Sequence, residues 1–361
     1  MSSNPKQANR FRHLLAASIA ALLATTGLAA CSSSNAGDAA TSDAATLRLG
    51  YFANITHALP LIGIANGTYA KVLGSTKLET QVFNAGPAAV EALFAGAIDA
   101  AYVGPNPAIN AFTKSNGEAI RIVAGASSGG AQLVVAPQYT DAASLKGTTI
   151  ATPQLGGTQD VALRFWLKSQ GLSAPTTGTG DVTVAPQENA QTLDLFKQGK
   201  IAGAWVPEPW ASRLVLEGGG KVLVDEATLW PKGAFVTTHL IVSTAFLTAH
   251  PQTVAKLLQA EYDTLQEVTA DPAKAKAAAN DALKALTGKQ LKPAVLERAW
   301  NNLTLTLDPI AAALQTSADH AVEVGTTKKA DLDGIYDLTL LNALLTNSSK
   351  PQASAAGLGK E

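Results

Sequence analysis

The sequence predicts an α/β protein of two lobes, each a mainly parallel sheet flanked by helices, with a hinge that the chain crosses twice. Three observations support this fold class. The chain has 361 residues, 47% of them hydrophobic, which is long for one simple domain. Strand and helix patterns alternate with short loops, as in parallel sheets covered by helices on both faces. The stretch "IDAAYVGPNP" from Ile98 is echoed by "IAGAWVPEPW" from Ile201, which indicates two similar units.

The first thirty residues have the features of a lipoprotein signal peptide. Basic residues precede an apolar stretch over 14–24 that is too short to span a bilayer comfortably. The stretch ends in "LAAC", and its Cys31 is the single cysteine of the chain. We expect Cys31 to carry a lipid, residues 31–45 to form a flexible tether, and the protein to sit lipid-anchored on the extracytoplasmic side of the cell membrane. The alternative is an ordinary secretory signal that contains a cysteine.

The first lobe is predicted over residues 46–136 and 236–350. A strand begins at Thr46, and helical spacing follows over 61–73. Pro87 near the start and Gly96 past the end delimit the next helix. The remaining elements expected before the chain leaves this lobe near Ala136 are strands over 78–83, 97–103, 120–125 and 131–136 and a helix over 108–114.

The second lobe is predicted over residues 137–235 and repeats this rhythm. It is expected to contain strands "TTIATP", "DVTVAP", "KIAGAWV" and "KVLVD", with helices between them. The strand from Phe235 to Ser243 would return the chain to the first lobe, so that two crossings form the hinge. The C-terminal part is expected to be mostly helical, with Asp271-Pro272 and Asp308-Pro309 as helix starts.

The two echoed segments occupy equivalent places in the two units. In each, a helix ends at glycine, a buried strand follows, and a proline-rich loop leads into another helix. Ligands of open α/β sheets bind at the carboxyl ends of strands. If the lobes face each other, both loops therefore line one cleft.

The order and spacing of several segments resemble a known family. They are "GYFANITHALP", "FNAGPAAVEALFAGAIDAAYVGPNPAI", "SLKGTTIATPQLGGTQDVALRFWLKSQGL" and "LFKQGKIAGAWVPEPWASRL". Together they resemble the substrate-binding proteins of ABC importers for aliphatic sulfonates, taurine and nitrate. Ala202 stands where related sequences usually carry the aspartate seen at Asp99, which we interpret as a structural loop partner.

The resemblance implies a type II periplasmic-binding-protein fold without catalysis. The ligand would be a small organic anion or zwitterion, handed to a membrane permease that a cytoplasmic ATPase drives. We expect a monomer that needs no cofactor.

Two predicted helix N-termini are candidate anion sites, because their N–H groups are unpaired and carry positive partial charge. One is at Gly86. The other is at Gly157, Thr158 and Gln159, in the opposite lobe. The alternative is that the glycines only shape turns.

Loops at the ends of strands supply further candidates. Asn54, Thr56 and His57 follow the first strand, although a lone loop histidine is often satisfied locally. Asn106 is a donor or a turn residue, and Ser127 and Ser128 are possible hydroxyl donors.

The loop "VPEPW" supplies the last two candidates. Trp210 is placed to wall the cleft, whereas Trp205 lies in a strand and is expected in the core. Glu208 either faces the ammonium of a zwitterion such as taurine or points away and pairs with Arg213 or another cation.

Other classes of function are disfavoured. A net charge of −1 without a long basic run argues against nucleic-acid binding, and the histidines lack metal-ligand spacing. "GASSG" around Ser127 matches a hydrolase nucleophile motif, with His239 or His250 as base, but a strand follows where a helix is required. Pyrimidine-precursor synthases share the fold, but they depend on a cysteine-rich motif that this chain lacks. A surface adhesin is also disfavoured, because it would not need a hinged cleft.

Overall fold

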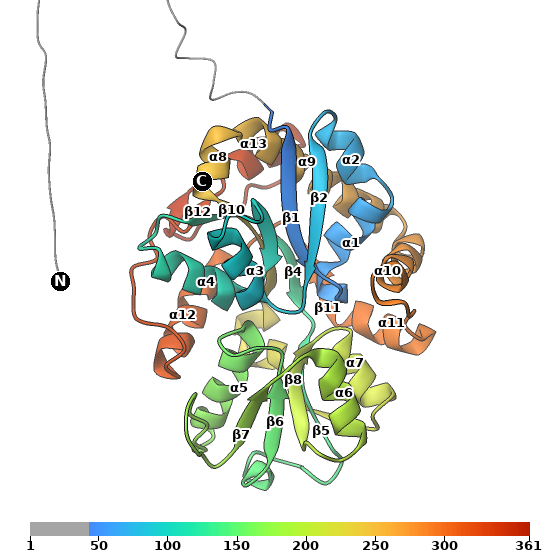
Figure 1. Ribbon diagram of the computed structural model, residues 1–361, viewed down its shortest axis with the longest axis vertical. Coiled ribbons are helices and arrows are strands. Elements are labelled where there is room, and N and C mark those ends of the chain that lie inside the picture. Colours follow the sequence, from blue (N-terminus) through green and yellow to red (C-terminus); the bar gives the residue numbers. More distant parts are fainter. Residues whose placement is uncertain (1–42) are drawn as a thin grey trace, which may run out of the picture. The chain divides into compact units, whose positions relative to one another are not determined.

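The computed structural model describes residues 43–361, which fall within one compact unit. The predicted signal peptide, Cys31 and most of the tether lie outside these residues. Within the described part, two separate sheets form the centres of two lobes, drawn above and below one another in Figure 1.

Within residues 43–361, eight strands form the sheet of the first lobe, in the order β13-β12-β4-β10-β3-β1-β2, with β11 also paired to β4. Buried aliphatic side chains of β1, β3, β4 and β10 make its core, which explains why nearly every residue of these strands is apolar or small. The bounds are β1 Thr46–Phe52, β2 Lys77–Phe83, β3 Ala100–Val103, β4 Ile120–Gly129, β10 Val236–Ser243, β11 Leu303–Leu305, β12 Tyr336–Asp337 and β13 Gly359–Lys360.

Five strands of the described residues form the sheet of the second lobe, in the order β7-β6-β8-β5-β9. Two apolar clusters cover its two faces, one centred on the buried Trp205, as the sequence predicted. The bounds are β5 Ala131–Val135, β6 Thr149–Thr152, β7 Thr183–Pro186, β8 Gly203–Pro207 and β9 Lys221–Asp225.

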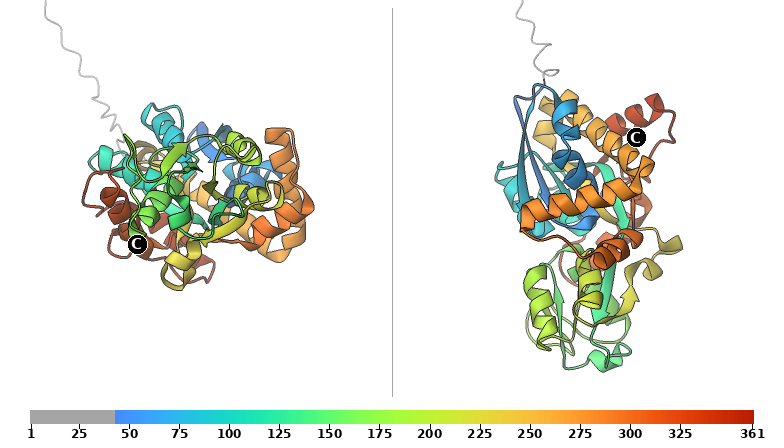
Figure 2. Two further views of the ribbon diagram at one scale, coloured as in Figure 1. Left: turned by 90° about the horizontal axis from the view of Figure 1, so that it is seen from below. Right: turned by 90° about the vertical axis from the view of Figure 1, so that its right-hand side faces the viewer.

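The helices cover both sheets and, in the C-terminal third, extend alongside the first lobe (Figure 2). Helix α9 packs an apolar stripe of Val254, Leu257, Leu258 and Val268 against the first core. Their bounds are α1 Ala58–Ala65, α2 Thr68–Leu73, α3 Gly86–Phe94, α4 Pro105–Lys114, α5 Thr158–Ser169, α6 Asn189–Lys197, α7 Trp210–Leu216, α8 Thr244–Ala249, α9 Pro251–Ala270, α10 Pro272–Thr287, α11 Pro293–Asn301, α12 Leu314–Glu323 and α13 Thr339–Asn347.

Five short 3₁₀ turns complete the described part of the chain. They are η1 Ile55–His57, η2 Ala143–Leu145, η3 Glu226–Leu229, η4 Pro231–Gly233 and η5 Ala311–Ala313.

The echoed segments do mark equivalent positions. In the first lobe β3 lies between β1, to which it is parallel, and β10, to which it is antiparallel. In the second lobe β8 lies between the parallel β6 and the antiparallel β5 in the same way. The strand order β2-β1-β3-β10-β4 of the first sheet therefore repeats in the second as β7-β6-β8-β5-β9. The fold is the predicted two-lobed α/β architecture with mixed sheets, but the second sheet is not mainly parallel, because β5 runs antiparallel to both β8 and β9.

Several predicted boundaries need correction. The first crossing occurs at Gly130 and not near Ala136, because β5 pairs with β8 and β9 in the second sheet. Gly129 and Gly130 both have positive φ, and they separate β4 from β5 at the point where the chain changes lobe. The second crossing lies between β9 and β10, close to the predicted position.

The C-terminal part also differs from expectation. The first sheet continues through β13 and so beyond residue 350. Asp271 caps α10 as predicted, with its side chain accepting from the Lys274 N–H. Asp308-Pro309 leads into the turn η5 instead of directly into an α-helix, since Ile310 has left-handed backbone angles.

Candidate functional site

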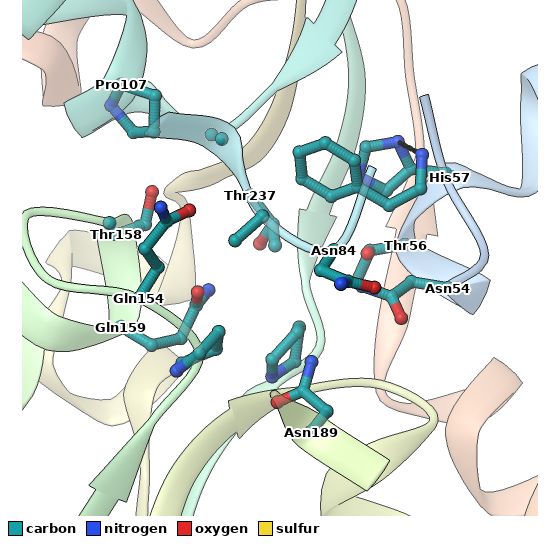
Figure 3. Close-up of a pocket in the computed structure, with 17 residues that line it drawn as sticks. Asn54, Thr56, His57, Asn84, Pro107, Gln154, Thr158, Gln159, Asn189 and Thr237 are labelled. Carbon is teal, nitrogen blue, oxygen red and sulfur yellow. Dashed lines mark hydrogen bonds between the residues drawn. The ribbon is translucent and has the colours of Figure 1, made fainter. Parts of the chain in front are cut away.

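A cavity between the two lobes is lined by residues at the ends of strands and the starts of helices. The space between these residues is about 440 Å³ when the part open to solvent is included, and about 30 Å³ of it is free for the centre of a water-sized molecule. The residues drawn in Figure 3 come from both lobes and face the same space. They are Phe52, Asn54, Thr56, His57, Asn84, Ala85, Gly86, Gly104, Pro107, Pro153, Gln154, Gly157, Thr158, Gln159, Asn189, Pro207 and Thr237.

The first lobe contributes the segment that follows β1. Asn54, Thr56 and His57 are buried and line the cavity. The Thr56 carbonyl accepts hydrogen bonds from the hydroxyls of Ser127, at 2.8 Å, and Thr238, at 3.1 Å, and these bonds fix the backbone of the turn. All three candidates that the sequence suggested in this loop therefore line the cavity.

His57 is a neutral hydrogen-bond donor. Its Nδ1 accepts from the Phe52 N–H at 3.3 Å, so the uncharged ring carries its proton on Nε2. The ring also lies 4.3 Å from the Phe52 ring, centroid to centroid. Burial lowers the pKa of His57 to about 3, and the imidazole is therefore uncharged at physiological pH.

The second lobe contributes the start of α5. Gly157, Thr158 and Gln159 all line the cavity, and Gly157 is the N-cap residue without a side-chain cap. Asp160 holds the preceding loop: its carboxylate accepts from the Gly156 N–H and the Thr152 hydroxyl, both at 3.0 Å. Arg164 in turn pairs with Asp160 at 3.0 Å, and both side chains are buried.

Other helix starts face the same space. Gly86 begins α3 and Asn189 begins α6, and neither helix has a side-chain cap at its N-terminus. Gly86 also has a packing reason, because a Cβ there would lie 2.3 Å from Cγ of Pro107. Residues at the N-termini of three helices thus line one cavity, and uncapped helix N-termini favour an anion.

Two polar atoms at the cavity are buried and have no hydrogen-bond partner within the described residues. They are Oγ1 of Thr158 and Oδ1 of Asn189, whose residues are 7% and 8% exposed. Buried polar groups are normally paired, because an unpaired one costs about 1–3 kcal/mol. Both residues line the cavity, so a bound molecule is the natural partner of each. The Thr158 hydroxyl can donate to an anion, whereas Asn189 Oδ1 only accepts and needs an N–H or O–H of the ligand.

The cavity carries no charged side chain. Among the described residues that line it, the polar groups are the imidazole of His57, three threonine hydroxyls, and the amides of Asn54, Asn84, Gln154, Gln159 and Asn189. Figure 3 shows Gln154 and Gln159 across the cavity from Asn54 and Asn84. Such a site binds a ligand by many neutral donors and not by an ion pair.

Glu208 does not line this cavity. It is 0% exposed and accepts from Ser212 Oγ at 2.9 Å, Arg298 at 3.1 Å and Asn302 at 2.6 Å. Burial raises its pKa, and these hydrogen bonds and Arg298 offset part of that effect. Of the two interpretations offered by the sequence, the structure agrees with the one in which Glu208 points away from the ligand site and pairs with a cation. That cation is Arg298. Arg213 instead pairs with Glu217 at 3.2 Å.

The remaining candidates also lie outside the cavity lining. Trp210 is adjacent to it: its Nε1 donates to Asn54 Oδ1 at 2.9 Å, across the two lobes. The Asn106 amide donates to the Ser317 carbonyl at 3.1 Å. Ser128 Oγ donates to the Phe235 carbonyl at 2.6 Å.

Ser127 is the residue of the possible nucleophile motif, and it sits inside β4. Its Oγ is fully buried and donates to the Thr56 carbonyl. The motif therefore lies in a continuous strand and lacks the sharp strand-to-helix turn that a hydrolase nucleophile needs.

Sequence reasoning missed several lining residues. Asn84 follows β2, Gln154 follows β6, and Asn189 starts the helix after β7. Asn54, Thr56 and His57 were selected because they are polar residues at the carboxyl end of a strand. The same rule would have selected all three of the missed residues. Asn84 also donates to Glu188 Oε1 at 2.6 Å, which is another contact between the lobes.

The chain is similar to known binding proteins in sequence and in fold. Residues 40–283 match the NMT1-like family. The chain belongs to the NMT1-like family. The taurine-binding periplasmic protein of Escherichia coli (strain K12) is 27% identical to this chain over 209 residues. A binding protein of Brucella abortus (strain 2308) is 31% identical over 172 residues. The matches cover 58% and 46% of this chain, but only 62% and 50% of those relatives.

Solved structures share the fold. The alkanesulfonate-binding protein SsuA of Xanthomonas axonopodis pv. citri, bound to MOPS, matches with a TM-score of 0.68 at 23% identity, over 80% of this chain and 96% of that one. The periplasmic nitrate-binding protein NrtA of Synechocystis PCC 6803 matches with a TM-score of 0.73 at 18% identity, over 88% and 92%. The relatives and neighbours named here are solute-binding proteins, and the fold is the periplasmic-binding-protein fold.

No helix within residues 43–361 has the length and apolar character to cross a membrane. The same residues contain no group of histidine, cysteine, aspartate and glutamate side chains placed to hold a metal ion.

Proposed function

We propose that this chain is the extracytoplasmic solute-binding component of an ABC importer and captures a small organic anion of the sulfonate class. The observation that carries the proposal is the interlobe cavity, where helix N-termini and neutral donors from both lobes converge without a charged side chain. The bound anion would be delivered to a membrane permease that an ATPase drives. The taurine-binding and alkanesulfonate-binding relatives support this substrate class.

The donor set favours a sulfonate over more densely charged anions. A sulfonate spreads one charge over three oxygens, and each oxygen accepts hydrogen bonds from amides, hydroxyls and backbone N–H groups. A phosphate dianion would be held without any lysine or arginine among the lining residues. Nitrate has the same number of oxygens in a smaller ion, and the nitrate-binding neighbour makes it the alternative ligand.

Binding without catalysis is the mode of action we infer. Ser127 is buried in a strand with its hydroxyl bonded to a carbonyl, so it is not prepared to attack a substrate. A fluorophosphonate probe should leave the purified protein unlabelled, and stoichiometric labelling at Ser127 would revive the hydrolase alternative.

We further propose that Cys31 carries a lipid anchor and that the folded part works outside the membrane as a monomer. The "LAAC" motif supports the anchor, and the name of the taurine-binding relative supports the compartment. The Cys31→Ser variant should move from the membrane to the soluble fraction on cell fractionation. Full membrane retention of that variant would exclude the anchor.

Lobe closure over the ligand is the expected motion. The two lobes are joined at Gly130 and between β9 and β10, and such double connections act as hinges. Small-angle scattering should give a smaller radius of gyration with ligand than without, and an unchanged profile at saturation would indicate a preformed site.

The substrate class is tested by isothermal titration calorimetry with ethanesulfonate, taurine and nitrate. At least one sulfonate should bind with 1:1 stoichiometry and more tightly than nitrate. Binding of nitrate alone would move the protein to the alternative substrate, and binding of none of the three would reject the anion class.

A further inference from the structure

A second, smaller cavity lies next to the anion cavity and shares one wall with it. Its space is about 260 Å³ including the part open to solvent, with about 20 Å³ free for the centre of a water-sized group, and it is lined by Glu226, Trp230, Phe235 and His320, among others. The shared residue is Thr158, whose side chain borders both spaces. What can bind in this second cavity follows from the charge and the chemistry of its walls.

Glu226 supplies a buried carboxylate without a cationic partner. It is 2% exposed, its Oε2 accepts from the Trp205 indole at 2.8 Å, and no cation within residues 43–361 acts on it. Burial raises the pKa of Glu226 to about 7, while hydrogen bonds from Trp205 and Trp230 offset only part of this and Asp225 adds to it. Buried carboxylates are usually paired with a cation. A ligand can supply the positive charge that Glu226 lacks.

Aromatic rings form much of the remaining wall. Trp230 stacks on Phe235 with centroids 5.7 Å apart, and it lies 5.7 Å from the His320 ring. His320 stacks on Phe165 at 3.5 Å. Burial lowers the pKa of His320, so the imidazole is neutral at physiological pH and does not itself provide the positive charge. Aromatic faces beside a carboxylate are the surroundings in which proteins hold ammonium groups.

One more polar atom at this cavity needs a partner. Thr158 Oγ1 is buried and unpartnered within the described residues, and its lone pairs can accept a hydrogen bond. The Asn106 amide, by contrast, is already used, since it donates to the Ser317 carbonyl. A ligand with several N–H donors and a positive charge would satisfy both Thr158 and Glu226.

We propose that this cavity binds an ammonium group, held by Glu226, the aromatic faces of Trp230 and Phe235, and the Thr158 hydroxyl. The group is either the amino end of a zwitterionic aminoalkanesulfonate, whose sulfonate occupies the neighbouring anion cavity, or a separate small amine. The first case rests on the proposed function, whereas the second does not.

The test compares ligands that differ only in the ammonium group. Calorimetric titrations use ethanesulfonate, taurine, the longer 3-aminopropanesulfonate, and methylammonium alone, on wild type and on Glu226→Gln. The control is Glu323→Gln, which removes the same charge near His320 from an exposed side chain that does not line the cavity. Trp230→Leu, at a half-buried position, is the second variant if Glu226→Gln folds poorly.

In wild type, an aminosulfonate should bind at least about tenfold more tightly than ethanesulfonate, and Glu226→Gln should remove that difference while Glu323→Gln keeps it. Methylammonium binding that is lost in Glu226→Gln would assign the cavity to a separate amine, which also supports the proposal. Trp230→Leu should weaken the amines and leave ethanesulfonate unchanged.

Two results separate failure of this inference from failure of the proposed function. If ethanesulfonate binds, no amine gains affinity, and Glu226→Gln changes nothing, the ammonium site is rejected while the anion site stands. If no sulfonate binds, the proposed function is rejected, and methylammonium alone then decides the ammonium site: Glu226-dependent binding supports it, and absence of binding overturns it.

Discussion

Arg298→Ala should destabilise the protein through the buried carboxylate that it leaves behind. The Arg298 guanidinium donates to Glu208 Oε1 at 3.1 Å, to Ser212 Oγ at 2.8 Å and to Gln132 Oε1 at 2.7 Å. These bonds join α11 to the second lobe beside the crossing at Gly130. The Glu208 side chain is 0% exposed and that of Arg298 is 23% exposed.

The magnitude follows from the burial of the two partners. Removing one partner of a buried ion pair typically costs 3–5 kcal/mol, and the partial exposure of Arg298 reduces this to about 2–4 kcal/mol in the free energy of unfolding. A matched control is Arg213→Ala. The Arg213 side chain is 24% exposed but pairs with Glu217 one helical turn away, so its loss should cost less than about 1 kcal/mol.

The loss should also depend on pH. Burial already raises the pKa of Glu208, and Arg298 is one of the groups that lower it. Without Arg298 the pKa of Glu208 in the folded state rises further above its unfolded value of about 4.3. The folded state then holds this proton more tightly than the unfolded state does, so stability falls as pH rises from the unfolded pKa through the folded pKa. The deficit of Arg298→Ala relative to wild type should therefore be larger at about pH 8 than at about pH 5.

Urea unfolding followed by tryptophan fluorescence measures these differences, and the chain has five tryptophans. Adding Glu208→Gln to Arg298→Ala should recover part of the lost stability and abolish the pH dependence of the deficit. Equal losses at both pH values, with no recovery in the double variant, would refute the reasoning.

Other substitutions and conditions test the cavity itself. Burial lowers the pKa of His57 to about 3, so the ring stays neutral between about pH 5 and pH 8. Calorimetry should therefore give the same sulfonate affinity over this range. A decline in affinity as pH rises would show that a charged imidazole takes part. Thr158→Val should weaken sulfonate binding about tenfold while leaving the urea midpoint unchanged or higher, since its hydroxyl is unpartnered without ligand; unchanged affinity would exclude a direct contact. Gly86→Ala should lower the melting temperature, because its Cβ would meet Pro107 at 2.3 Å, and a wild-type value would mean that α3 shifts freely.

The sequence predicted the fold through local patterns that tertiary packing did not override. The echo from Ile98 and Ile201 identified β3 and β8, which do occupy the same place in the two sheets. The first crossing was placed too late, because the strand predicted over 131–136 was assigned to the first lobe, whereas β5 pairs with β8 and β9 in the second sheet. The change of lobe coincides with the Gly129-Gly130 pair, whose positive φ values separate β4 from β5.

The binding cavity was predictable in part. The loop after β1 and the start of α5 were selected because polar or glycine residues follow a strand there, and both segments line the cavity. Glu208 could not be assigned from the sequence, since its cation, Arg298, is 90 positions away and reaches it only through the packing of α11 on the second lobe. The orientation of the Trp210 side chain was likewise not predictable, because its indole donates to Asn54, a residue of the other lobe.

The most direct test of the central claim is a calorimetric titration of ethanesulfonate against ethanesulfonamide, its neutral counterpart. The claim is that uncharged donors at converging helix N-termini hold a small organic anion between the lobes. The sulfonate should bind 1:1 with micromolar or tighter affinity, and the sulfonamide should bind at least about a hundredfold more weakly, because the helix N-termini favour negative charge. Equal binding of both compounds, or binding of neither, would contradict the account.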